Sequence, residues 1–311
     1  MSTRNGGLGL YRFAHKLPLL KLGLYAKLAL SDNITREILK DPVWIKDVLT
    51  QQQAYRRLTG HEFVSALRGK QRLEERDFQK LSSKVQGFGS MAFVNDYIGN
   101  SWLKGYTPRW QGRRYVSALR LRSNLVATNE MRWRGRGTHA DRLCRFGCNA
   151  VESQAHVLQA CHRLKRARIK RHHLIVDMVA KQASASGMLV EKELVVKMPD
   201  MTTLRPDLVL RKGDEIKVVD VTVPYEFDEF SLRNAENRKH ESYGILKDIL
   251  LRKYPDSTTF STVGFVIGAR GAWHKGNNPF CKELNASVAW KRRLVRSVLD
   301  GSMCMMNKFG T

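Results

Sequence analysis

The sequence predicts a mixed α/β protein, in which a mostly helical N-terminal half is followed by a C-terminal domain of strands and helices. Up to about residue 187, Leu- and Ala-rich stretches carry apolar residues at helical spacing. From Leu189 onward, short runs rich in Val, Ile, Leu and Thr alternate with turns and a long helical stretch. The chain has 311 residues, 42% of them hydrophobic, which is enough to bury a core in one large domain or two modest ones.

Start and stop signals place the helices of the N-terminal half. Ser31-Asp32-Asn33 ends the first Leu-rich stretch, and Asp41-Pro42 starts another with a capping residue ahead of a proline. The segment 132–141, RWRGRGTHAD, is expected to be a loop. The expected helices are 17–30, a stretch from Asp41, 71–85, 111–131 and 168–183.

The C-terminal part alternates between strand and helix patterns, which favours a mixed sheet packed against helices. A Lys212-Gly213-Asp214 turn joins two apolar runs, so they are expected to form a hairpin. The expected strands are 189–197, 206–211, 216–224 and 260–267, and the expected helices are 229–252 and 283–299.

The charge balance indicates a polyanionic partner. Lys and Arg number 54 against 29 Asp and Glu, a formal net charge of +25. Residues 101–171 hold 17 of the bases and only three acids, and they are interleaved by Trp102, Tyr106, Trp110, Tyr115 and Trp133. Basic groups neutralise phosphates and aromatic faces stack on unpaired bases, so nucleic acid is the expected partner and a solvated face the alternative. The candidate contacts in this stretch are Arg113, Arg114, Arg120, Arg122, Arg132, Arg134 and Arg136.

Other classes of protein fit the sequence poorly. No apolar run approaches the length of a membrane span, and MSTRNGGLGL does not have the pattern of a secretory signal. Five cysteines in a chain of this length do not make a disulfide scaffold. An anionic membrane surface is the weaker alternative partner, because no basic helix has a clean apolar face. An intracellular protein is therefore expected.

A cysteine cluster follows the basic stretch. It reads Cys144-x3-Cys148-x7-His156-x4-Cys161, four soft or borderline ligands within eighteen residues. Thiolate and imidazole together suit tetrahedral zinc, and four protein ligands leave no open position, so the site is predicted to be a structural zinc knuckle. His162 is the alternative fourth ligand, whereas His172 and His173 on the next helix are expected to face solvent or phosphate. Three scattered buried thiols are the alternative interpretation, which the clustering disfavours.

Two carboxylates lie on the predicted hairpin. Asp207 opens its first strand, and Asp220 lies inside the apolar second strand, where an unpaired charge is costly. Two such carboxylates can share a hard cation such as magnesium, which activates water and stabilises charge on a phosphodiester. The alternative interpretation is one turn Asp and one structural Asp.

These residues resemble the PD-(D/E)xK nuclease pattern of the restriction-endonuclease-like fold. Pro206-Asp207 supplies the first part and Asp220 follows with twelve residues between, but Thr222 stands where the pattern expects Lys. Some members of the family carry the lysine on the next helix, which makes Lys239 the candidate here; a surface lysine is the alternative. The rival Lys217 is an odd number of residues from Asp220 on one strand, so its side chain is expected to face away.

The wider string resembles the C-terminal part of site-specific retrotransposon polyproteins without long terminal repeats, which insert into ribosomal RNA genes. The resemblance rests on the knuckle, the RPDLVL and VVDVTVPYE strings, a Lys-to-Tyr helix and the run from Gly268 to Trp273. The opening segment from Arg4 to Leu10 is similar to the start of the thumb. The implied domains are a thumb-like region 1–100, a basic linker 101–143, the CCHC knuckle with its helix 144–187, and a restriction-like endonuclease domain 188–311.

The resemblance implies a nuclear, magnesium-dependent DNA endonuclease that nicks target DNA to prime reverse transcription. Asp207 and Asp220 would hold magnesium, Lys239 would act toward water and phosphate, and Arg270 would contact DNA or cap its loop. Glu226 and Tyr243 are secondary candidates. Target DNA and element RNA are the implied partners.

No paired-aspartate polymerase motif occurs in the sequence, so a truncated element or a captured C-terminus without its polymerase palm is expected. The alternative function is a non-catalytic nucleic-acid-binding remnant of such a polyprotein.

Overall fold

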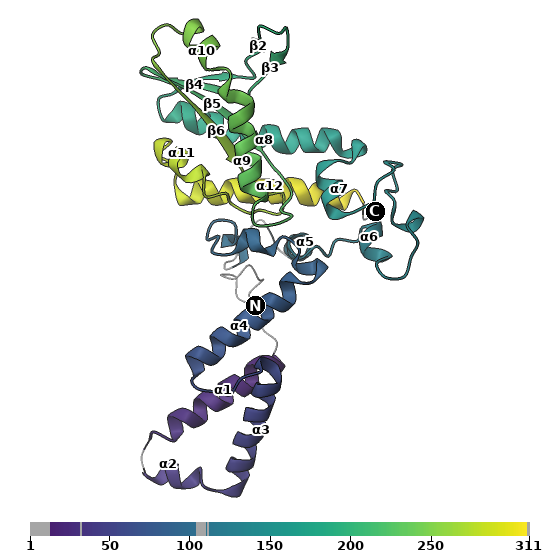
Figure 1. Cartoon of the computed structure of the whole chain (residues 1–311), viewed down its shortest axis with the longest axis vertical. Helices are drawn as coiled ribbons and strands as arrows, with labels where there is room; N and C mark the ends of the chain where they lie inside the picture. Colours follow the sequence, from purple (N-terminus) through teal and green to yellow (C-terminus); the bar gives the residue numbers. More distant parts are fainter. Residues whose placement is uncertain (1–12, 32, 104–109, 111, 310–311) are drawn as a thin grey trace.

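The structure, a computed structural model, describes residues 13–31, 33–103, 110 and 112–309. The molecule is elongated, with an arm of N-terminal helices at one end and the β-sheet at the other (Figure 1). The segment from Arg4 to Leu10 and Tyr106 lie outside the described residues. None of the described helices combines the length and the apolar character that a membrane span requires.

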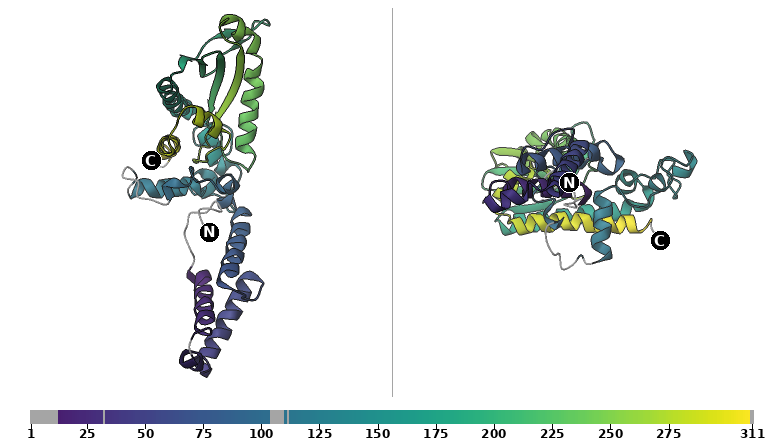
Figure 2. Two further views of the ribbon diagram at one scale, coloured as in Figure 1. Left: turned by 90° about the vertical axis from the view of Figure 1, so that its left-hand side faces the viewer. Right: turned by 90° about the horizontal axis from the view of Figure 1, so that it is seen from below.

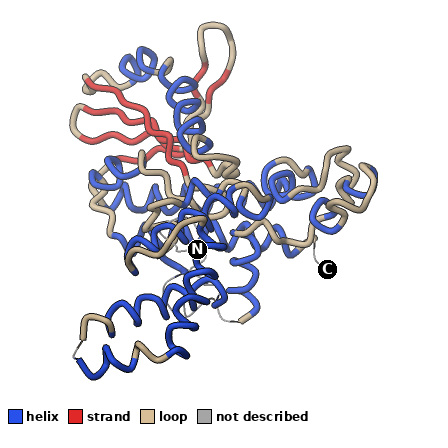
Figure 3. Tube along the Cα trace, turned by 60° about the horizontal axis from the view of Figure 1, so that its bottom comes forward, coloured by secondary structure: helices blue, strands red, loops and turns tan. Residues whose placement is uncertain are grey.

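The C-terminal part is built on a mixed four-stranded sheet, as the sequence predicts (Figure 3). Its order is β1-β4-β5-β6, with antiparallel pairing from β1 to β5 and a parallel pair between β5 and β6. The strands are β1 (Leu189–Lys192), β4 (Leu208–Lys212), β5 (Glu215–Thr222) and β6 (Thr259–Val266).

The β4–β5 hairpin is confirmed, with Lys212 paired to Glu215 across a two-residue turn. Gly213 enables this turn because its φ of 58° lies in the left-handed region, which other residues rarely adopt. The register runs from that turn to the pair Leu208 and Val219. The residues that come next to this last pair, Asp207 and Asp220, therefore lie together at the end of the hairpin opposite its turn.

Helices cover both faces of the sheet (Figure 2). On one face, Val219 and Val221 of β5 pack with Ile175 and Val179 of α8 (Lys165–Ala185). On the other, Val218 packs with Leu246 and Leu250 near α9 (Ser231–Gly244) and α10 (Lys247–Lys253). This division follows from the alternation of side chains along a strand, and it places Asp220 on the side of α9. The last helix, α12 (Val288–Asn307), packs along α8.

Several predicted boundaries were wrong in this half. The expected strand 189–197 is interrupted at Glu193, where φ is 52°. Its last part forms a separate strand, β2 (Val196–Lys197), which pairs with β3 (Thr203–Leu204). The expected helix 229–252 is split at Ile245, and Leu246 from the break is fully buried beside the sheet. The expected helix 283–299 is instead α11 (Asn277–Glu283) followed by α12.

The middle of the chain packs beneath the sheet domain. The helix expected over 111–131 is broken into α5 (Arg113–Arg122) and α6 (Asn129–Arg132), with Asn124 at a left-handed φ of 54° between them. Trp102 lies edge-on to Trp110, with ring centroids 5.5 Å apart, and the Trp110 indole N–H donates to Asp300 of α12 over 2.8 Å. These buried tryptophans hold the linker to the C-terminal part and are not free to stack on bases.

The N-terminal arm is held together by a small core of Leu19, Leu22, Tyr55 and Leu73. Its third helix begins as predicted, because the Asp41 side chain accepts from the Val43 N–H ahead of Pro42. The arm consists of α1 (Phe13–Leu28), α2 (Asn33–Ile38), α3 (Pro42–Thr59) and α4 (Ala66–Ser82). The remaining short elements are η1 (Val85–Gly87), η2 (Ser90–Phe93), η3 (Ser101–Leu103), η4 (Ala140–Arg142), α7 (Gln154–Gln159) and η5 (His162–Leu164).

Candidate functional site

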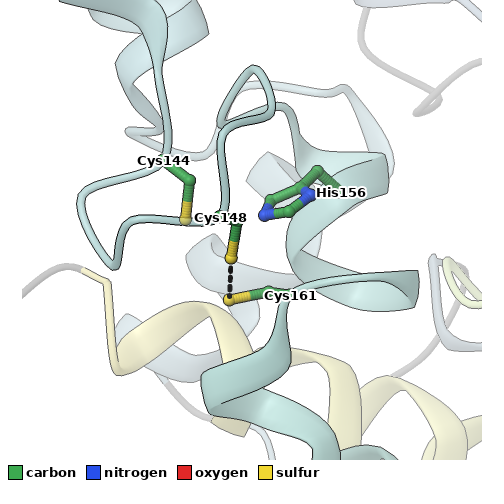
Figure 4. Close-up of side chains that lie close together, drawn as sticks. All are labelled: Cys144, Cys148, His156 and Cys161. Carbon is green, nitrogen blue, oxygen red and sulfur yellow. Dashed lines mark hydrogen bonds between the residues drawn. The ribbon is translucent and has the colours of Figure 1, made fainter.

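The four predicted zinc ligands converge, with ligand atoms that all lie within 4.8 Å of one another (Figure 4). Cys144 and Cys148 flank a tight turn in which the Gly147 N–H donates to the Cys144 carbonyl and Gly147 takes a φ of 72°. His156 comes from α7, and Cys161 lies two residues after the end of that helix. The Cys148 and Cys161 sulfurs are 3.7 Å apart.

The donor set fits a tetrahedral zinc ion. Nε2 of His156 is buried and, within the described residues, has no hydrogen-bond partner, as expected of an atom that binds a metal. Burial raises the pKa of Cys161 to about 11 and also raises that of Cys144. A cation would reverse this preference by stabilising the thiolates. The sequence-based alternative, His162, is exposed and contacts the Cys148 sulfur through Nδ1 at 3.0 Å.

The two predicted carboxylates meet at the end of the hairpin. Asp207 lies just before β4, and its Oδ2 accepts from the Val221 N–H of β5 over 2.7 Å. Asp220 is 5% exposed. Burial, and then the charge of Asp207, raise the pKa of Asp220, although Lys239 opposes this shift. Two repelling carboxylates in a partly buried site are an arrangement that a divalent cation would stabilise.

Lys239 reaches the acidic pair from α9, with Nζ 2.7 Å from Oδ2 of Asp220. One turn further along lies Tyr243, whose hydroxyl donates to the Arg205 carbonyl over 3.5 Å. Burial, followed by the nearby Asp220 charge, raises the pKa of this tyrosine. Both side chains therefore come to the sheet from the face that the alternation along β5 predicts. The sequence-based choice of Lys239 is matched by a direct contact.

Lys217 lies on the opposite face of β5, as its odd spacing from Asp220 predicts. Its ammonium pairs with Glu283 of α11 and with Glu215, 3.2 Å away. It also lies 5.9 Å from the ring centroid of Phe280. This lysine is buried on the other face of the sheet and is not available to Asp207 and Asp220.

His172 is a site residue that the sequence analysis missed, because it predicted a solvent- or phosphate-facing side chain. Nε2 of His172, from α8, lies 3.1 Å from Oδ2 of Asp207 and 3.0 Å from the Val221 carbonyl oxygen. Its neighbour His173 is exposed and lies 3.7 Å from Glu193. The sequence gave no signal that His172 would reach Asp207, because this contact depends on how α8 packs.

Two arginines predicted to contact nucleic acid are buried, which is a correction. Arg270 is fully buried and bonds to Glu226, to the Phe88 carbonyl and to the Arg122 carbonyl. Arg122 is 4% exposed, and its guanidinium carbon lies 3.3 Å from the ring centroid of Phe93. With every face occupied by protein, neither guanidinium is available to a phosphate. Glu226 is likewise a fully buried structural partner and not a site residue.

The other predicted arginines lie at or near the surface. Arg113, Arg120, Arg132 and Arg136 are exposed, Arg114 pairs with Asp300 at 3.0 Å, and Arg134 lies 3.7 Å from Glu130. In the glycine-rich loop after α6, Trp133 is 42% exposed, with the Arg136 guanidinium 5.9 Å from its ring centroid. An exposed tryptophan among arginines has the chemistry of a base-stacking surface.

The curated relatives of this chain are proteins of one kind. It is 28% identical over 310 residues to a retrovirus-related Pol polyprotein from type-1 retrotransposable element R2 of Popillia japonica, covering 98% of the chain and 61% of that protein. A second such polyprotein from that organism is 31% identical over 71% of the chain and 36% of its own length. The Pol polyprotein of type-2 element R2DM of Drosophila melanogaster is 25% identical over 87% of the chain and 25% of its own length.

These matches confirm the resemblance to a retrotransposon polyprotein without long terminal repeats. The chain spans between about a quarter and three fifths of the length of these three relatives. No family model matches the chain.

Proposed function

We propose that this chain, whose homologues over most of its length are Pol polyproteins of R2 retrotransposons, is a magnesium-dependent DNA endonuclease module. It would nick target DNA and so provide a 3′ hydroxyl that primes reverse transcription of the element RNA. The polymerase palm would be supplied from outside these residues, since the sequence carries no paired-aspartate polymerase motif. The proposed place of action is the nucleus.

The contact between Lys239 and Asp220, 2.7 Å long and next to Asp207, is the observation that carries this proposal. A lysine from a helix, a carboxylate inside a central strand and a second carboxylate at the start of the neighbouring strand are the parts of a PD-(D/E)xK site. Their arrangement on a mixed sheet between helices supports the endonuclease fold as part of the proposal. A purely structural Asp220 would be paired with Lys239 but would not need Asp207 beside it.

Asp207 and Asp220 would hold the metal, and magnesium bound there would lower the pKa of a water molecule and neutralise charge on the scissile phosphate. Lys239 would place its ammonium beside the attacked phosphate and orient water. Tyr243 would support Asp220 through its hydroxyl. The low exposure of Asp220 would strengthen each of these electrostatic interactions relative to bulk water.

The basic surface would hold the nucleic acid. The exposed arginines of α5 and of the loop after α6 provide charge for phosphates, and Trp133 offers an aromatic face. The Cys144–Cys161 cluster, with zinc bound, would hold the base of that loop, because the Asn129 side chain of α6 donates to the Leu143 carbonyl, next to the first cysteine, over 2.9 Å. Target DNA and element RNA are the proposed partners.

A nicking assay on supercoiled plasmid, with and without magnesium, tests the proposal. The wild-type chain should convert supercoiled to open-circular DNA only with magnesium, and Asp207→Ala should not. Asp200→Asn changes an exposed loop carboxylate that bonds to the neighbouring Thr202; it is the matched control and should nick normally. DNA binding without nicking by the wild-type chain would favour the alternative of a non-catalytic nucleic-acid-binding remnant.

A further inference from the structure

His172 links two parts of the molecule that the sequence separates. It lies on α8, eleven residues after the last predicted zinc ligand, Cys161, and 35 positions before Asp207. Its side chain is 29% exposed and that of Asp207 is 14% exposed, so their contact is partly shielded from water. Nothing in the PD-(D/E)xK pattern assigns a role to this histidine.

The two neighbours of Nε2 determine where its proton lies. Oδ2 of Asp207 and the Val221 carbonyl oxygen both accept hydrogen bonds, at 3.1 and 3.0 Å. Two acceptors around one ring nitrogen require that this nitrogen carry the hydrogen. Nε2–H of His172 is therefore a donor shared between Asp207 and the backbone of β5.

Oδ2 of Asp207 consequently receives two N–H groups. One comes from Val221 at 2.7 Å and the other from His172. Among the described residues, the hydrogen bonds of this carboxylate all end on Oδ2. The carboxylate plane is thus fixed from one side, and Oδ1 remains directed away from the donors.

We propose that His172 is a positioning residue for the divalent-cation site, which holds Asp207 through Nε2–H so that its carboxylate is preset to receive magnesium. This inference rests on the proposed nuclease function. Hydrogen bonds from an outer residue orient a ligating group and remove part of the cost of ordering it when the metal binds. A preset carboxylate therefore raises the affinity for the cation.

The position of His172 is itself fixed by the helical turn of α8 that precedes it. Arg171, 4% exposed, donates to the Ser302 hydroxyl of α12 at 2.8 Å and to the Leu158 carbonyl at 3.2 Å. Arg168 donates to the Cys161 carbonyl at 2.6 Å. These contacts hold the helix against sliding or rotation, so His172 meets Asp207 in one register.

A magnesium titration of the full chain without DNA, followed by calorimetry, tests this role. Removing an outer-shell donor weakens metal binding about 10- to 100-fold, so His172→Ala should raise the dissociation constant by that factor. His172→Gln should restore most of the affinity, because the glutamine amide can present an N–H at a similar reach. His173→Ala removes the neighbouring, exposed histidine and should bind magnesium as the wild type does.

The outcomes separate this inference from the nuclease proposal. Unchanged affinity in His172→Ala would overturn the positioning role. Equal losses in His172→Ala and His172→Gln would also overturn it, and would indicate that the imidazole itself is a ligand. Asp207→Asn tests the proposed function itself. If this variant binds magnesium as the wild type does, the assignment of the metal site to Asp207 and Asp220 is wrong. If only Asp207→Asn loses binding, the metal site stands and the role of His172 fails.

Discussion

Gly264 of β6 pairs with Asp220 of β5 in parallel register, and α9 crosses the sheet over this glycine. A β-carbon added at Gly264 would lie 3.0 Å from both the Cα and the carbonyl oxygen of Glu236. Glu236 precedes Lys239 by about one helical turn. The missing side chain therefore sets how closely α9 approaches the sheet, and with it the reach of Lys239 to Asp220.

Gly264→Ala should move α9 outward and separate Lys239 from Asp220. A displacement of about 1 Å in a catalytic group can cost about 100-fold in rate, so nicking should fall by a factor of that order. Overpacking should also cost about 1–3 kcal/mol of stability. Nicking rates and thermal unfolding measure the two effects. Gly244→Ala, on the same helix where a β-carbon meets nothing within 4 Å, should nick normally.

Lys239→Ala should slow nicking by about 100-fold or more, because the ammonium beside the acidic pair is lost while the carboxylates remain. Magnesium binding should persist, since this side chain is not a proposed ligand. Lys217→Ala is the comparison. It removes the ion pair between the buried Lys217 ammonium and the exposed Glu283, so it should lower the melting temperature but leave the folded protein able to nick. Full activity in Lys239→Ala would refute its assignment.

One zinc ion per chain is expected through Cys144, Cys148, His156 and Cys161. Cys148→Ser and His156→Ala should each lose zinc in metal analysis, whereas His162→Ala should retain it, because His162 only approaches one sulfur from the exposed side. A chelator should also reduce helix content at α8, which begins just after Cys161. Zinc content that stays unchanged in His156→Ala and falls in His162→Ala would reverse the ligand assignment.

Affinity for DNA should fall steeply with salt, because counterion release dominates binding through phosphates. Charge reversal of Arg113, Arg120 and Arg132 should weaken binding to all sequences alike and reduce the salt slope by about one per lost phosphate contact. Arg122→Glu should behave differently, since it places a charge of the wrong sign in the core and should unfold the protein. Affinity that does not change with salt would contradict this account.

Stability should depend on the protonation of Asp220. The fold raises the pKa of this carboxyl through burial and through Asp207, so ionisation opposes folding. This penalty is absent below the pKa that Asp220 has in the unfolded chain, and it grows as pH rises through the pKa of Asp220 in the folded protein. Asp220→Asn should therefore melt higher than the metal-free wild type at neutral pH, by an amount that shrinks in acid. Melting curves across that pH range measure this, and a lower melting point at neutral pH would contradict it.

The local features of the site could be predicted from the sequence, but its long-range contacts could not. The hairpin and both carboxylates follow from strand patterns and a glycine turn, and the alternation along β5 correctly placed Lys217 away from Asp220. His172 was missed because its contact depends on the packing of α8. Arg270 was wrongly predicted to contact DNA, because its partner Glu226 is 44 positions away and an arginine in a Gly-Ala-Arg-Gly string is typical of a surface loop.

The aromatic residues of the basic stretch illustrate the same limit. Trp102 and Trp110 read as base-stacking candidates next to arginines, but they form the contact between the linker and α12. Trp133 remains exposed. Composition alone does not separate these two uses of tryptophan, since burial depends on partners nearly 200 residues away along the chain.

The most direct test of the nuclease account compares cutting and binding in the same variants. Asp207→Asn and Asp220→Asn should each abolish magnesium-dependent nicking of plasmid DNA, and their affinity for DNA should remain near that of the wild type. The reason is that these carboxylates would hold the metal while a separate basic surface holds the DNA. Full nicking activity in Asp207→Asn would contradict the nuclease assignment.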